Sequence, residues 1–188
     1  MAYKSILTIV TDPQAAAHQV DAAVDLARRF DAHLEVLCVG IDRAPNGYYY
    51  AGAVPVVSDE TFVQAQEDAR ASATAMQARL ESEDIRWSVD SSVAQIGALS
   101  SQVGLRARFS DLVVLARPYG TKVGPEAEAV VESALFEGHA PVLVLPADGN
   151  GASFGSRIVL AWNQSNEAMN AARAALPLLK AASSVSVT

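Results

Sequence analysis

The stretch from residue 111 to residue 146 constrains the fold most, because two apolar runs flank a segment with helical spacing. Residues 112–116 (LVVLA) and 142–145 (VLVL) show little polar alternation, which is typical of parallel strands covered on both faces. Between them, apolar side chains recur at spacings of three and four: Ala127, Val130, Val131, Ala134 and Leu135. This pattern predicts a strand, a crossover helix and a second parallel strand. In such a sheet, small ligands bind beyond the carboxyl ends of the strands.

Strands and helices alternate through the preceding residues as well. Residues 5–11, 34–40 and 85–91 are rich in strand-forming side chains and predict three more strands. The helices between them are predicted from apolar stripes: Ala16, Val20, Ala23, Ala27 and Phe30; Phe62, Ala65, Ala69, Ala73, Met76 and Leu80; and Ile96, Leu99, Val103 and Ala107. Short joints between these elements favour right-handed crossovers, and hence an α/β fold with a parallel sheet.

Two connections stand out in the first half of the chain. Asp12 and Pro13 end the first strand, and we expect Asp12 to cap the following helix, with Pro13 at its first position.

Residues 40–58 form a connection that is long for a compact domain, and it contains Tyr48 to Tyr50. Consecutive tyrosines can stack on a ligand base, line a subunit contact or fold over their own domain. The sequence leaves these alternatives open.

The last part of the chain repeats its beginning. Residues 147–156 are glycine-rich and predict a linker. After the linker, the segment IVLAWN corresponds to LTIVTD near the start of the chain, and SVSV near the end corresponds to LEVL. We therefore predict one complete domain over residues 1–146 and an incomplete second copy over residues 157–188. Proline removes a helical hydrogen bond, so the repeated helix should bend at Pro177.

Charge and composition exclude several classes of protein. The chain carries 14 basic and 21 acidic residues, a net charge of −7, without a run of Lys or Arg. Nucleic acids and anionic membranes are bound mainly by clustered basic side chains, so we expect neither as a partner. No apolar stretch reaches the roughly 20 residues that span a bilayer. The single cysteine, Cys38, lies in an apolar run, which favours a buried thiol in a reducing compartment and a cytoplasmic protein.

With this order of elements, the chain resembles the universal stress protein family, and in particular its tandem members. The resemblance rests on ILTIVTD, HLEVLCV, DLVVLA and ESALFEGHAPVLVLP. It implies a doubly wound, Rossmann-like sheet of five parallel strands in the order 3-2-1-4-5, with helices on both faces. The ends of strands one and four then face each other across a crevice. It also implies a homodimer that pairs through the last strand, Val142, Leu143, Val144 and Leu145.

Members of this family that bind ATP are similar in carrying G-x2-G-x9-G-[S/T] after the fourth strand. The glycines let backbone N–H groups approach the phosphates. Here Gly120 and Gly124 are separated by three residues, and the later Gly-Ser step falls at Glu128 and Ala129. A glutamate at that place repels a phosphate, and Glu126 adds to the repulsion. The segment therefore resembles a degenerate nucleotide-binding loop.

ATP is nevertheless a candidate cofactor. If a nucleotide binds, the resemblance points to the following residues: Asp12, Val39, Arg117, Gly120, Lys122 and Gly124. Asp12 matches the acidic residue that contacts the nucleotide in the family, and Val39 matches the position beside the base. Arg117 and Lys122 offset part of the acidic charge in the loop. For Asp12, a plain helix cap explains the residue equally well.

The sequence contains no recognisable catalytic or metal site. His18, His33 and His139 fall in a helix, at a strand start and before the last strand, where surface or capping roles are commoner than catalysis. Acidic residues such as Asp42 and Asp111 form no metal-binding set. We expect a non-catalytic stress-response or regulatory module that dimerises. The alternatives are an ATP- or AMP-binding stress protein, a weak nucleotide hydrolase, and an adaptor for a protein partner.

Overall fold

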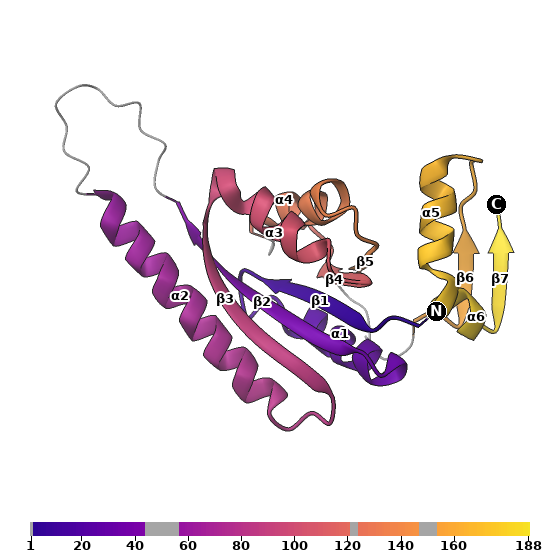
Figure 1. The fold of residues 1–188 in the computed structure, drawn as a ribbon, viewed down its shortest axis with the longest axis horizontal. Coiled ribbons are helices and arrows are strands. Elements are labelled where there is room, and N and C mark those ends of the chain that lie inside the picture. The colour runs from indigo at the N-terminus through magenta and orange to yellow at the C-terminus, as the bar shows by residue number, and fades with distance from the viewer. Residues whose placement is uncertain (1, 44–56, 121–123, 147–153) are drawn as a thin grey trace.

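The computed structural model describes residues 2–43, 57–120, 124–146 and 154–188. Tyr48 to Tyr50 lie outside the described residues, so the alternatives for that connection stay open. None of the described helices combines the length and the apolarity that a membrane span requires. The elements drawn in Figure 1 follow one another in this order: β1 (Ser5–Val10), α1 (Ala17–Phe30), β2 (His33–Asp42), α2 (Val57–Leu80), β3 (Arg86–Gln95), η1 (Ile96–Ala98), α3 (Leu99–Ala107), β4 (Leu112–Ala116), α4 (Ala127–Glu132), η2 (Ser133–Glu137), β5 (Val142–Leu145), β6 (Arg157–Leu160), α5 (Asn166–Ala174), α6 (Leu176–Ala181) and β7 (Ser184–Val187).

The first five strands form one parallel sheet in the order β3-β2-β1-β4-β5, which confirms the predicted doubly wound fold. β1 pairs with β2 along its whole length, from Ser5 to Val10. On its other side β1 pairs with β4 only from Ile6 to Thr8. The two strands therefore part beyond Thr8. The strand order reverses at the same point, which is where doubly wound folds bind their ligands.

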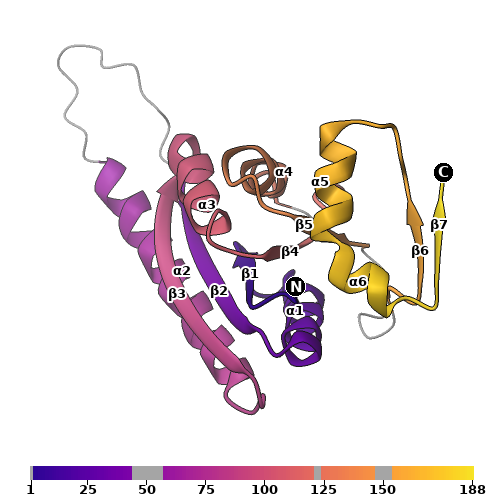
Figure 2. The same ribbon diagram turned by 45° about the vertical axis from the view of Figure 1, so that its right-hand side comes forward.

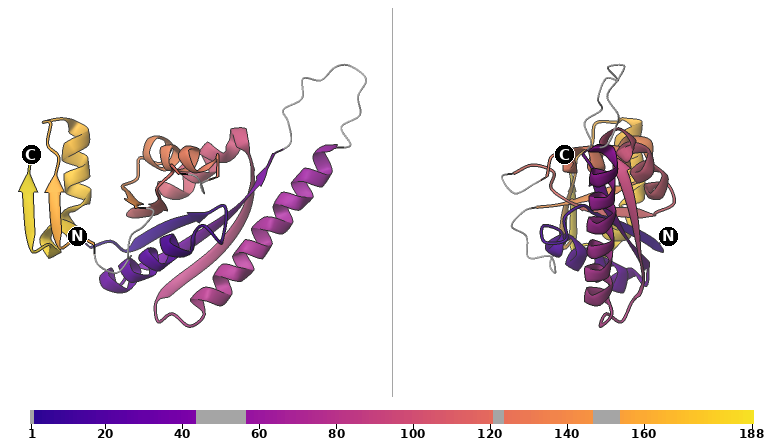
Figure 3. Two further views of the ribbon diagram at one scale, coloured as in Figure 1. Left: turned by 180° about the vertical axis from the view of Figure 1, so that it is seen from behind. Right: turned by 90° about the vertical axis from the view of Figure 1, so that its left-hand side faces the viewer.

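Helices cover both faces of this sheet, with α1 and α2 on one face and α3 and α4 on the other (Figures 1 and 3). Successive residues of a strand point to opposite faces, so alternate side chains of β1 enter different cores. Ile6 and Val10 pack beneath α1 and α2, whereas Leu7 and Ile9 pack beneath α3 and α4. The uninterrupted apolar runs of the sequence follow from this double coverage.

Three side chains that were predicted to point inward are exposed: Phe62, Ile96 and Leu135. Ile96 belongs to the 3-10 turn η1 and Leu135 to the π-helical turn η2, and a change of helical pitch changes which residues face the sheet. Phe62 lies in the turn of α2 before Ala65. There the helix approaches β2 closely, because a Cβ on Gly40 would come within 1.9 Å of the Ala65 carbonyl oxygen. A phenyl ring does not fit into such a contact.

The last residues form a separate strand–helix–strand unit, in which β6 and β7 make a parallel two-stranded sheet. α5 ends at Ala174, and α6 begins at Leu176 with Pro177 in its first turn, which confirms the predicted bend. α5 lies between the first unit and the β6–β7 sheet (Figures 1 and 2). Phe154 and Leu178 pack against the core of the first unit. That this unit is an incomplete second copy of the fold remains a prediction.

Candidate functional site

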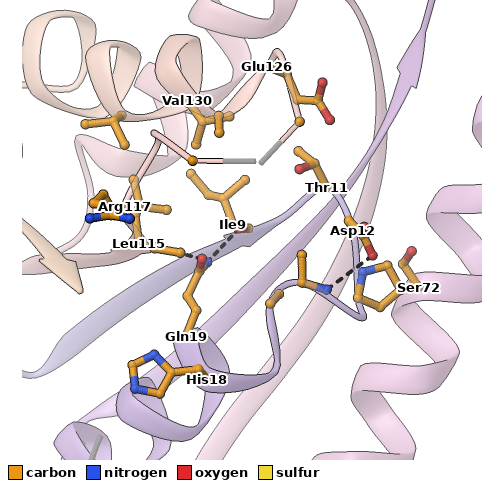
Figure 4. A pocket seen from close by; sticks show the side chains of 18 of the residues that line it. Ile9, Thr11, Asp12, His18, Gln19, Ser72, Leu115, Arg117, Glu126 and Val130 are labelled. Carbon is orange, nitrogen blue, oxygen red and sulfur yellow. Dashed lines mark hydrogen bonds between the residues drawn. The ribbon is translucent and has the colours of Figure 1, made fainter. Parts of the chain in front are cut away.

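A cavity of about 980 Å³ opens where β1 and β4 part (Figure 4). The end of β1 and the turn before α1 form one side of it, and the segment after β4 and the start of α4 form the other. The side chains that the site depends on are Asp12, Gln19, Arg43, Arg117, Glu126 and Val130. We call this cavity the crevice. It lies at the reversal of strand order, where the sequence predicted a ligand site.

The structure brings Asp12, Arg117, Gly120 and Gly124 together around the crevice. Val39 is buried in the core beneath α3 and α4 and does not line the crevice. Lys122 lies outside the described residues. Four of the six residues predicted to bind a nucleotide therefore line the crevice. Their role in binding stays a prediction.

Asp12 caps a turn rather than the helix itself. Its Oδ1 accepts hydrogen bonds from the N–H groups of Gln14 at 2.8 Å and Ala15 at 3.3 Å, but α1 begins only at Ala17. The prediction that Asp12 caps the helix, with Pro13 in its first position, was therefore wrong in detail. Pro13 belongs to an additional turn that joins β1 to α1. That turn carries the Asp12 carboxylate to the mouth of the crevice (Figure 4).

The first two backbone donors at the end of β4 are already engaged. The N–H of Arg117 donates to the Leu145 carbonyl oxygen of β5 at 3.0 Å, and the N–H of Ala116 donates to the Gln19 side chain at 2.9 Å. The Arg117 Nε donates to the Tyr119 carbonyl oxygen at 3.2 Å. Gly120 has φ of 140°, a conformation that only glycine adopts without strain. The chain thus turns sharply here, but its first amides are already engaged.

Glu126 and Arg43 join the two sides of the crevice. Arg43 follows β2, and its guanidinium lies 3.1 Å from Glu126 Oε2. The Glu126 side chain is only 9% exposed, whereas that of Arg43 is 59% exposed. The carboxylate also lies against Gly124, since a Cβ on Gly124 would meet Glu126 Oε1 at 2.6 Å. A negative charge therefore occupies the turn at which a phosphate cradle would be built, and it already neutralises Arg43.

Sequence reasoning missed Gln19 and Arg43 as residues of the crevice. Arg43 carries no local signal, because it reaches Glu126 only through the tertiary fold. Gln19 does carry one. It lies three residues after Ala16 and four before Ala23, both of which are buried, so a polar side chain falls on the apolar face of α1.

Among the described residues, His18 lines the crevice itself, and the other histidines and acidic residues do not assemble into a second site. Within the described parts of the chain, no group of three or more His, Cys, Asp or Glu residues could hold a metal ion. Asp111 accepts hydrogen bonds from the N–H groups of Lys4 and Ser5 and so joins β4 to β1. His33 contacts the Ser88 hydroxyl at 2.8 Å, near the amino ends of β2 and β3, at the end of the sheet opposite the crevice.

Neither the protein-family models nor the curated proteins contain a match to this chain, but solved structures do match it. UspA from Lactobacillus plantarum superimposes with a TM-score of 0.58 at 21% identity, over 77% of this chain and 99% of that protein. A universal stress protein family member from Burkholderia pseudomallei superimposes with a TM-score of 0.51 at 21% identity, over 76% of this chain and 96% of that protein. The chain has the fold of the universal stress proteins. The resemblance found in the sequence is thus confirmed at the level of the fold.

A third structure extends the similarity toward the end of the chain. The universal stress protein from Archaeoglobus fulgidus DSM 4304 matches with a TM-score of 0.64 at 14% identity, over 96% of this chain and 66% of that protein. A match of that extent includes residues of both the first and the second unit. Within the universal stress protein fold, the crevice of this chain lies at the switch point between β1 and β4.

Proposed function

We propose that the protein is a non-catalytic stress-response module whose crevice holds an adenine nucleoside or monophosphate and disfavours ATP. The proposal is supported by the universal stress protein fold, by the cavity at the switch point, and by the Asp12 carboxylate at its mouth. Cavities of several hundred Å³ are typical of small-molecule sites. The same crevice lacks the glycine spacing of a triphosphate cradle, and the Ala116 and Arg117 N–H groups are already engaged.

The single observation that carries the proposal is the position of Glu126. Its carboxylate is largely buried, lies against Gly124 and pairs with Arg43. A phosphate in this turn would approach a negative charge in a partly desolvated place, at a cost of about 1 kcal/mol or more. Arg43 offers little compensation because Glu126 already neutralises it. Each additional phosphate group on the ligand should therefore weaken binding.

A non-catalytic role is supported by the chemistry around the crevice. The Asp12 Oδ1 that a mechanism would use as a base accepts two backbone N–H groups. The hydroxyl–imidazole contact between Ser88 and His33 lies at the far end of the sheet. Neither arrangement positions a nucleophile and a base within hydrogen-bond reach of a ligand in the crevice.

Calorimetry and product analysis with the full chain test the proposal. Adenosine, AMP and ATP with Mg²⁺ are titrated separately, and the ATP mixture is then analysed for ADP. We expect adenosine or AMP to bind more tightly than ATP, and no ADP to form. Tighter binding of ATP, or its conversion to ADP, would overturn the proposal in favour of a nucleotide-binding or hydrolysing stress protein. If none of the three binds, the adaptor function is favoured.

We also propose that two copies of the chain pair through β5. β5 is an edge strand of the described sheet, and an unpaired edge is a template for pairing with another chain. Val142, Leu143 and Leu145 are partly or fully buried, while Val144 is 42% exposed. Val144→Lys should convert a dimer to a monomer in light scattering. Val159→Lys, an equally apolar exposed position in β6, serves as the control and should leave the dimer intact.

The proposed compartment is the cytoplasm. Cys38 is a free, fully buried cysteine, which is compatible with a reducing environment. Fractionation of cells that express the full chain tests this assignment, and recovery of the protein in a membrane or extracellular fraction would contradict it.

A further inference from the structure

Gln19 is a buried polar side chain at the floor of the crevice. Only 6% of the residue is exposed. Its Nε2 donates to the Thr8 hydroxyl at 2.7 Å and to the Ile9 carbonyl oxygen at 2.8 Å. Its Oε1 accepts the N–H of Ala116 at 2.9 Å. The orientation of the amide is fixed by chemistry, because the Ile9 carbonyl can only accept and the Ala116 N–H can only donate.

These hydrogen bonds replace a missing part of the sheet. The pairing of β1 with β4 stops at Thr8 and Val114, so Ile9 and Ala116 lie just beyond the last paired residues. A backbone carbonyl and an N–H group at such a place need another partner, since leaving them unpaired in a buried position is costly. The side-chain amide of Gln19 supplies a donor to one and an acceptor to the other (Figure 4).

We propose that Gln19 is a specificity-determining residue of the crevice. Its side chain forms the floor of the crevice, and because it accepts the Ala116 N–H, that donor is not available to a ligand. This inference rests on the proposed binding of an adenine nucleoside or nucleotide. Backbone N–H groups at the carboxyl ends of the strands are donors to ligand oxygens in doubly wound folds. With Arg117 N–H bonded to β5, the Ala116 N–H is the donor that faces β1. Gln19 withholds it, so a ligand is held above Gln19 and without this hydrogen bond.

The amide is the functional group that suits this position. A carboxylate at residue 19 has no proton to donate to Ile9 and would face its carbonyl oxygen, whereas a short apolar side chain leaves both backbone groups open to the crevice. Gln19→Glu should therefore destabilise the protein without improving binding. Gln19→Ala should destabilise it too, but it should release the Ala116 N–H to a ligand hydroxyl or phosphate oxygen.

The test combines amide hydrogen exchange by NMR with calorimetry on the full chain, using AMP as the ligand. In Gln19→Ala, we expect the Ala116 amide to exchange at least tenfold faster than in the wild type, and to regain protection when AMP is added. AMP should bind the variant about fivefold more tightly, although its thermal midpoint is lower. Val24→Ala, a buried position further along α1, controls for loss of stability and should bind AMP as the wild type does.

The outcomes separate this inference from the proposed function. If the wild type binds AMP and Gln19→Ala binds it equally or more weakly, Gln19 has only a structural role and the inference is overturned. An Ala116 amide that stays protected in Gln19→Ala would overturn it as well, whether or not a ligand binds. If the Ala116 amide opens as expected but neither protein binds adenosine or AMP, the proposed function fails, and the specificity role of Gln19 fails with it.

Discussion

The hydroxyl of Tyr3 donates a hydrogen bond of 2.8 Å to the carbonyl oxygen of Ala174. In an unbroken helix this carbonyl would accept the N–H of Leu178, but that N–H donates to Ala175 at 2.9 Å instead. The interruption at Pro177 thus leaves an acceptor at the end of α5. Tyr3, which precedes β1, uses it to hold the second unit against the first.

Tyr3→Phe should loosen the second unit without disturbing the first. The ring keeps its edge contact with Phe30, whose centroid lies 5.0 Å away, and only the hydrogen bond is lost, at a cost of about 1 kcal/mol. Hydrogen–deuterium exchange followed by mass spectrometry should show faster exchange in residues 157–188. Tyr119→Phe, at an exposed position, is the control. Unchanged exchange in residues 157–188 would show that apolar packing alone holds the unit.

Gly40→Ala should destabilise the protein strongly. A Cβ there would lie 1.9 Å from the Ala65 carbonyl oxygen, so α2 would have to move away from β2, and overpacking of this kind costs about 1–3 kcal/mol. Gly97→Ala is the matched control, because a Cβ there meets nothing within 4 Å. Urea denaturation should show a lower midpoint for the first variant and little change for the second. Equal midpoints would contradict the close approach of α2 to β2.

Stability should fall in alkaline solution because of Cys38. Burial raises the pKa of the Cys38 thiol from 9.0 to about 11, and the charge of Asp90 adds to the effect. Because the pKa is higher in the folded state, the protonated thiol contributes fully to the free energy of unfolding below about pH 9. This contribution is lost as the pH rises to about 11, which lowers the free energy of unfolding by roughly 2–3 kcal/mol. Urea denaturation across this range should show the decline.

The control for this experiment is Cys38→Ala, which should lose less stability between the same pH values. Part of the remaining decline comes from Tyr3, because burial and then the charge of Asp111 raise the pKa of its hydroxyl. An equal decline in the variant and the wild type would mean that the Cys38 thiol does not titrate in the way that its burial implies.

Glu126→Gln should raise the affinity for ATP. The substitution removes the buried charge beside Gly124 and frees Arg43 to contact a phosphate, and a gain of about 1 kcal/mol corresponds to roughly fivefold tighter binding. Glu132→Gln removes an exposed charge from α4, the helix that follows Glu126, and should leave the affinity unchanged in calorimetry. The same small gain in both variants would point to net charge rather than to the position of Glu126.

The apolar runs were sufficient to predict the sheet. Residues 112–116 and 142–145 are both strands, as predicted, and the order of strands followed from the family resemblance. Coverage on both faces holds for β4, but it was wrong for β5, where Val144 is exposed at the edge of the sheet. Apolar periodicity predicted the buried faces of the helices less well where the helical pitch changes. Ile96 and Leu135 are exposed because a 3-10 turn and a π-helical turn shift the phase, and apolar periodicity assumes a constant pitch.

For the crevice, the sequence by itself determined where the strands end, that Asp12 follows β1, and that Gly120 and Gly124 are irregularly spaced after β4. Each of these features is a local pattern. Only the tertiary structure decided that Arg43 pairs with Glu126 and that Gln19 bridges Ile9 and Ala116. The Arg43–Glu126 and Gln19–Ala116 contacts join residues far apart in the chain. The Gln19 bridge lies where β1 and β4 part after Thr8. The divergence of two strands depends on how the whole sheet twists, so it is a property of the folded sheet and not of any single segment.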